Sequence, residues 1–81
     1  MANEHLIKAF GQRIRNLRTQ KGLSQEKLAE ITGFHRTYIG MVERGERNIT
    51  LANIGVFADS FEMTVSRLLN FEDMRGDGDG R

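Results

Sequence analysis

The chain has no cysteine, no proline and no tryptophan among its 81 residues. The lack of cysteine excludes disulfides, thiolate metal sites and cysteine nucleophiles, and it fits a reducing cytoplasm. Long apolar runs are also missing: none approaches the roughly 20 residues of a membrane span, and the N-terminus lacks the apolar stretch of a signal peptide. We therefore expect one soluble cytoplasmic domain, with little room for an enclosed active site beside its core.

The spacing of the apolar residues predicts helices rather than strands. They recur three and four positions apart through most of the sequence, and there is no alternating valine-rich run. The predicted fold is therefore all-α, with five helices. In the first helix, Asn3 is the expected N-cap, and basic residues such as Arg13 lie off the apolar stripe. The stripe itself consists of Ile7, Phe10, Ile14 and Leu17.

Residues 22–48, GLSQEKLAEITGFHRTYIGMVERGERN, have the pattern of a helix-turn-helix. Ser24 is expected to cap the second helix, Gly33 to end it in the left-handed conformation, and the third helix to begin near His35. The apolar positions expected to face the core are Leu28, Ala29, Ile31, Ile39 and Val42. The positions of the third helix expected to face outward are Arg36, Thr37, Gly40, Met41 and Arg44.

Two further helices follow a polar loop. Thr50 is the expected cap of the fourth helix, and Thr64 is the expected start of the fifth, which carries Val65, Leu68 and Leu69. The expected buried side of the fourth helix consists of Leu51, Ile54, Phe57, Ala58 and Phe61. Residues 1–71 would then form the domain, and the glycine-rich, charged residues 72–81 would form a disordered tail without an assigned function.

The net charge of +1 conceals an uneven distribution. Residues 8–47 hold nine Lys and Arg against four Asp and Glu, a net +5, whereas the other residues hold three against seven, a net −4. Charges coat any soluble surface, so this segregation alone favours nucleic-acid binding only weakly. Its coincidence with the helix-turn-helix strengthens that interpretation.

The patterns LSQEKLA and YIGMVERGERN, separated by a glycine, resemble the phage-repressor and Cro type (XRE) of helix-turn-helix regulators over roughly residues 6–70. The stretch HRTYIGMVERGERNITLANI is similar to the controller proteins of restriction-modification systems. The resemblance implies a homodimer on double-stranded DNA with a pseudo-palindromic operator. It also implies activation of its own operon at low occupancy and repression once a second site fills. A plain prophage or operon repressor and a helix-turn-helix antitoxin are the alternatives.

The resemblance places base contacts on the third helix and the loop after it. Arginine is the informative residue, because its planar fork matches guanine O6 and N7 in the major groove. The alternative for Arg36 is a solvated surface residue, and the alternative for Tyr38 is a ring that covers the core edge. The implied base-contacting residues are Arg36, Thr37, Tyr38, His35, Met41 and Arg47.

Two further sets of residues follow from the resemblance. Gln25 matches a position that clamps a phosphate at the start of the second helix, and the other phosphate candidates are Ser24, Arg44 and Asn48. Arg18 and Glu43 match an internal ion pair that ties the first helix to the third.

The remaining expectations concern partners. A dimer is expected because one recognition helix touches few base pairs, and its expected interface is Val65, Leu69 and Phe71, unless these residues only cap the core. Glu26 and Glu30 match the acidic patch that phage-family activators present to RNA polymerase, with the sigma subunit as candidate partner. The alternative is that the two glutamates face solvent and bind no partner.

Enzymatic function is not expected. No phosphate loop or Ser/His/Asp constellation can be assembled, and His5 and His35 are far apart in sequence without acidic companions at ligand spacing. No metal or cofactor is expected either. An antitoxin would copurify with a toxin, and its tail would carry an apolar binding segment rather than DGDGR.

Overall fold

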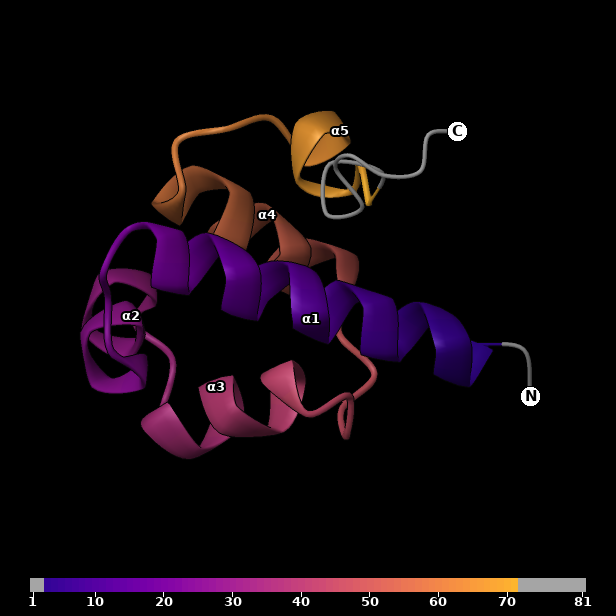
Figure 1. Ribbon diagram of the computed structural model, residues 1–81, viewed down its shortest axis with the longest axis horizontal. Helices are drawn as coiled ribbons and strands as arrows, with labels where there is room; N and C mark the ends of the chain where they lie inside the picture. Colours follow the sequence, from indigo (N-terminus) through magenta and orange to yellow (C-terminus); the bar gives the residue numbers. More distant parts are fainter. Residues whose placement is uncertain (1–2, 72–81) are drawn as a thin grey trace.

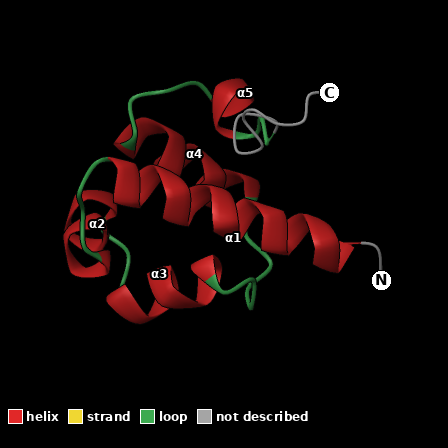
Figure 2. Cartoon of the chain, viewed as in Figure 1, coloured by secondary structure: helices red, strands yellow, loops and turns green. Residues whose placement is uncertain are grey.

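The computed structural model describes residues 3–71. The described part contains five α-helices and no strand (Figures 1 and 2), which confirms the predicted all-α fold. The helices are α1 (Asn3–Gln20), α2 (Gln25–Thr32), α3 (Arg36–Glu43), α4 (Leu51–Ser60) and α5 (Val65–Leu68). The predicted tail, residues 72–81, lies outside the described residues. Within residues 3–71, no helix has both the length and the apolar character needed to cross a membrane.

Four of the helices begin at a side chain that accepts a hydrogen bond from a backbone N–H one turn into the helix, which satisfies a donor that the helix itself leaves unpaired. These N-caps are Ser24, His35, Thr50 and Thr64. Asn3, by contrast, lies inside α1 instead of at the cap position before it, so that prediction was wrong. Gly33 ends α2 with φ 83°, as expected for a left-handed cap.

The core lies between α1 and the other four helices. Phe57 of α4 is at its centre, with its ring 6.0 Å from that of Phe10 and 5.3 Å from that of Phe34. The buried apolar residues are Phe10, Ile14, Leu17, Leu28, Ala29, Ile39, Val42, Phe57, Ala58, Phe61 and Leu68. In Figure 1, α3 lies at the lower edge of the molecule and α5 at the upper edge, with α1 and α4 between them. The second helix of the helix-turn-helix, α3, and the short last helix therefore occupy opposite sides.

Two apolar residues expected in the core are exposed. Ile31 is 47% exposed, because the buried face of α2 is centred between Leu28 and Ala29, and Ile31 projects well to one side of it. Leu51 is 76% exposed, because it is the first residue of α4 and precedes by one turn the part of this helix that packs on the core. Helical periodicity alone placed both residues incorrectly.

Arg13, expected outside the apolar stripe, is only 4% exposed. Its Nε donates to the carbonyl oxygen of Leu68 at 2.9 Å, and its Nη2 donates to that of Arg67 at 2.8 Å. Carbonyls at a helix C-terminus lack intrahelical partners, so a guanidinium can satisfy several of them at once. Arg13 thus ties the four-residue α5 to α1.

Candidate nucleic-acid interface

The first turn of α3 presents polar side chains to solvent. His35, Arg36 and Thr37 are all exposed. The ring of His35 serves the helix itself, since its Nδ1 accepts a hydrogen bond from the backbone N–H of Thr37 at 3.1 Å. His35 therefore caps α3, while the Arg36 and Thr37 side chains project from the start of the helix.

A second group of predicted base-contacting residues lies together beside this turn. The guanidinium carbon of Arg47 is 5.3 Å from the centroid of the Tyr38 ring, within cation–π range. Arg47 Nη1 also lies 3.7 Å from the sulfur of Met41. The structure therefore brings Tyr38, Met41 and Arg47, from α3 and the following loop, into one cluster.

Tyr38 also has a packing role. Its ring meets Phe34 edge to face at 5.0 Å, and its hydroxyl oxygen accepts a hydrogen bond from Asn53 Nδ2 of α4 at 3.0 Å. The side chain is half-buried. Tyr38 thus covers the edge of the core while its hydroxyl is fixed by a residue that the sequence analysis did not single out.

Gly40 is buried, although it was expected to face outward. A Cβ at this position would lie 3.1 Å from Nη1 of Arg44 and 3.7 Å from Oε1 of Gln25. Two predicted phosphate-contacting side chains, one from α2 and one following α3, therefore both lie close to Gly40. The glycine makes room for them instead of exposing its backbone to a partner.

The ion pair between Arg18 and Glu43 lies beneath this surface. Arg18 Nε is 2.6 Å from Glu43 Oε2 and Nη2 is 3.0 Å from Oε1, with the two side chains only 12% and 3% exposed. Gln25 Nε2 donates to Glu43 Oε1 at 3.1 Å, and Arg18 Nη1 donates to the carbonyl oxygen of Leu23 at 2.8 Å. This one carboxylate therefore connects α1, α2 and α3.

Arg44 and Glu46 form a second, exposed pair, with Nε and Nη2 of Arg44 at 3.0 and 3.1 Å from the two carboxylate oxygens. Their mutual hydrogen bonds lower the pKa of the Glu46 carboxyl and raise the pKa of the Arg44 guanidinium. Ser24 is exposed, with its hydroxyl engaged as the α2 cap, and Asn48 is exposed in the loop before α4.

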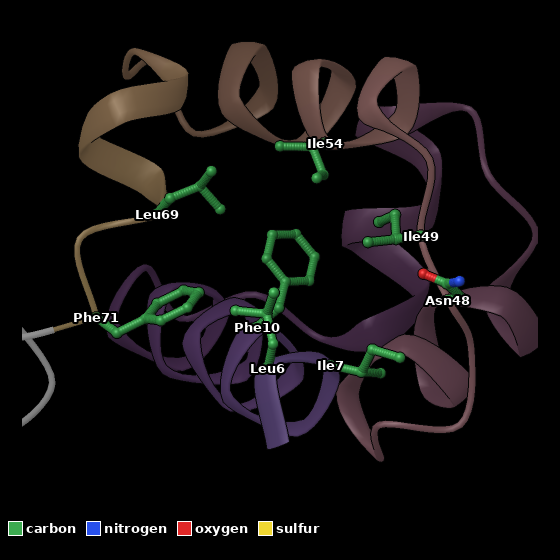
Figure 3. A pocket seen from close by; sticks show the side chains of 8 residues that line it. All are labelled: Leu6, Ile7, Phe10, Asn48, Ile49, Ile54, Leu69 and Phe71. Carbon is green, nitrogen blue, oxygen red and sulfur yellow. The ribbon is translucent and has the colours of Figure 1, made fainter. Parts of the chain in front are cut away.

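A separate apolar groove of about 270 Å³ lies between the N-terminal part of α1, the start of α4 and the end of α5. Figure 3 shows Leu69 and Ile54 on one side of it and Leu6 and Phe10 on the other. The lining residues are Leu6, Ile7, Phe10, Asn48, Ile49, Ile54, Leu69 and Phe71. Of the predicted dimer residues, Val65 and Leu69 are 36% and 37% exposed, and Phe71 packs partly on the core.

The remaining predicted positions are simple to place. Glu26 and Glu30 are both exposed on α2, and Glu30 lies 3.4 Å from Nζ of Lys27. Among the described residues, no group of three or more His, Cys, Asp or Glu side chains could hold a metal ion.

The family model described as Helix-turn-helix (HTH_3) matches residues 14–69, and the chain therefore belongs to this family of DNA-binding transcription regulators. It is 44% identical over 68 residues to control protein C.SmaI of Serratia marcescens, a match that covers 84% of this chain and 81% of that protein. The similarity to restriction-modification controller proteins is thus confirmed.

Solved structures give the same result. The restriction-modification controller protein C.AhdI from Aeromonas hydrophila matches with a TM-score of 0.73 at 50% identity, over 76% of this chain and 94% of that one. The controller protein C.Esp1396I, crystallised as a tetramer with its natural 35-base-pair operator, matches with a TM-score of 0.73 at 30% identity, over 85% and 87% of the two chains.

Proposed function

We propose that this protein is the controller of a restriction-modification operon. In this proposal a dimer binds pseudo-palindromic half-sites near its own promoter, activates transcription at low occupancy and represses it once a second site fills. The observation that supports it most is the exposed polar first turn of α3, in a chain that is 44% identical to a control protein.

In a transcription assay on its own promoter, the amount of transcript should rise and then fall as the protein concentration increases. A plain repressor would show only the fall, and an antitoxin would copurify with a toxin.

In this proposal α3 lies in the major groove. Arg36 donates two hydrogen bonds to a guanine, Thr37 offers a hydroxyl and a methyl group, and the Tyr38, Met41 and Arg47 cluster faces a neighbouring base. His35 lies at the same end of the helix. Phosphates are contacted by Gln25 and Arg44 above Gly40, with Ser24 and Asn48 at the edges. The acidic residues Glu26 and Glu30 of α2 face the sigma subunit of RNA polymerase.

Replacing Arg36 by alanine tests the base contact. DNA affinity should fall by about 1–3 kcal/mol, and the preference at one base of each half-site should relax, because a fork-shaped donor pair is lost. Base preferences can be measured by selecting bound sites from random DNA at fixed salt.

Arg67→Ala is the matched control, since Arg67 is exposed on α5, on the opposite side of the molecule from α3 (Figure 1). It removes the same charge and should leave the base preferences intact. The decisive readout is base preference: if Arg67→Ala relaxed it as Arg36→Ala does, α3 would not read bases in the groove.

Dimerisation in this proposal uses the exposed side of α5 and the adjacent groove. Replacing Leu69 by lysine should give monomers by sedimentation at micromolar concentration, since a charge would enter an apolar interface. Ile31→Lys is the control: Ile31 is likewise a partly exposed apolar residue near a helix C-terminus, but it lies on α2. If Leu69→Lys sediments as wild type does, the interface lies elsewhere.

A further inference from the structure

The hydrogen bond between Asn53 and Tyr38 joins the recognition helix to α4, outside the helix-turn-helix. Asn53 Nδ2 donates to the Tyr38 hydroxyl oxygen at 3.0 Å in a part-buried setting. The contact of the Tyr38 ring with Phe34 at 5.0 Å restricts the ring as well. Both the position of the hydroxyl and the direction of one of its hydrogen bonds are thus set from within the protein.

The direction of this hydrogen bond has a chemical consequence. A phenol carries one hydrogen, and its oxygen can also accept. Because the oxygen already accepts from Asn53, the hydrogen remains available for a second partner. The hydroxyl therefore acts toward its surroundings as a donor.

We propose that Asn53 is a specificity-determining residue that acts through Tyr38, by making its hydroxyl a hydrogen-bond donor to a base in the major groove. The proposal rests on the proposed function, in which α3 occupies that groove. A donor favours the acceptors guanine O6 and N7, adenine N7 and thymine O4 over the amino groups of adenine and cytosine. Asn53 itself contacts no DNA in this arrangement and is a positioning residue.

The neighbour of Tyr38 supports the same polarity. Arg47, 5.3 Å from the ring centroid, carries only donors and a positive charge. Tyr38 and Arg47 together therefore present donors alone, and such a pair suits the acceptor-rich edge of guanine better than any edge with an amino group.

Replacing Asn53 by aspartate tests the polarity. A carboxylate only accepts, so the phenolic hydrogen would turn toward it and the Tyr38 oxygen would become an acceptor. Base selection should then shift at one position of each half-site, by about 3- to 10-fold toward a base that offers an amino group. Asn53→Leu, which neither donates nor accepts, should weaken the preference at that position without reversing it.

The aspartate variant should fold, because Asn53 lies in the first turn of α4, where a negative charge is favourable and where its backbone N–H is capped by Thr50. Asn48→Asp introduces the same charge at an exposed nearby residue and serves as the control. It should weaken binding to all sequences without changing the selected base. In a Tyr38→Phe background, Asn53→Asp should no longer alter the preference.

The outcomes separate the two proposals. If Tyr38→Phe changes base selection and Asn53→Asp reproduces the wild-type pattern, the hydroxyl already donates to Asn53 and the inference is overturned. It is also overturned if neither variant changes selection while Arg36→Ala still does. If Arg36→Ala leaves affinity and selection unchanged as well, α3 does not read the groove and the proposed function fails.

Discussion

Replacing Glu43 by alanine is expected to lower the free energy of unfolding by about 3–5 kcal/mol, because it leaves the guanidinium of Arg18 buried without its partner. The carboxylate is 3% exposed and the guanidinium side chain 12% exposed, so water cannot replace the lost contacts. The same substitution removes the acceptor of Gln25 at the start of α2. Urea unfolding of the purified protein measures the loss.

The chain contains a matched control for this substitution. Glu46→Ala breaks an Arg–Glu pair with similar two-point geometry, but its side chains are 58% and 53% exposed. Surface pairs of this kind contribute little, so its unfolding free energy should stay close to that of wild type. Equal effects of Glu43→Ala and Glu46→Ala would contradict the structural role of the buried pair.

A double replacement distinguishes lost charge pairing from lost packing. Buried ion pairs exchanged for apolar residues of similar size are often neutral or stabilising, because two desolvation costs disappear together. Arg18→Met with Glu43→Leu should therefore recover most of the stability lost in Glu43→Ala. Recovery would show that the single variant suffers from the stranded charge rather than from a cavity.

The parts of this structure that the sequence predicted are mostly local. Ser24, Thr50 and Thr64 were recognisable as caps because an N-cap bonds to a backbone N–H two or three residues further on. Gly33 was recognisable as a helix end because glycine adopts the left-handed conformation of a C-cap without steric cost. The Arg18–Glu43 pair came from family resemblance, since no local pattern links residues 25 positions apart.

The missed features depend on how distant elements pack. Arg13 donates hydrogen bonds to carbonyls of α5 more than 50 residues away in sequence. Asn53 of α4 donates one to Tyr38 of α3. The spacing of apolar residues in the sequence predicts neither contact, because each depends on which faces of two helices pack against each other. The exposure of Leu51 also depends on packing, because an apolar residue in the sequence does not show where along the helix the core ends.

Gly11 was also missed, although it carried a signal. A glycine in the interior of a helix costs about 1 kcal/mol relative to alanine, so its presence in α1 calls for a compensating contact. The structure shows one: a Cβ on Gly11 would overlap the carbonyl oxygen of Val42 and lie 2.8 Å from that of Glu43. These are backbone atoms of α3, which therefore lies directly against α1.

Gly11→Ala should consequently move α3, because no side-chain rotation can relieve a clash with backbone. Overpacking of this kind costs about 1–3 kcal/mol of stability, even though alanine is the better helix former. DNA affinity should fall further, by about tenfold or more, since the proposed base contacts of Arg36 and its neighbours depend on the position of α3. Thermal unfolding and DNA titration at a temperature where the variant is folded measure the two effects separately.

Gly55→Ala is the control that makes this result interpretable. Gly55 also lies inside a helix, α4, but a Cβ there would meet nothing within 4 Å. Alanine should therefore stabilise the protein at this position, by about 0.5–1 kcal/mol, and leave DNA binding intact. Opposite signs for the two glycines would show that α1 sets the position of α3 through backbone contact. A stabilised Gly11→Ala variant with unchanged DNA affinity would show instead that the two helices can separate freely.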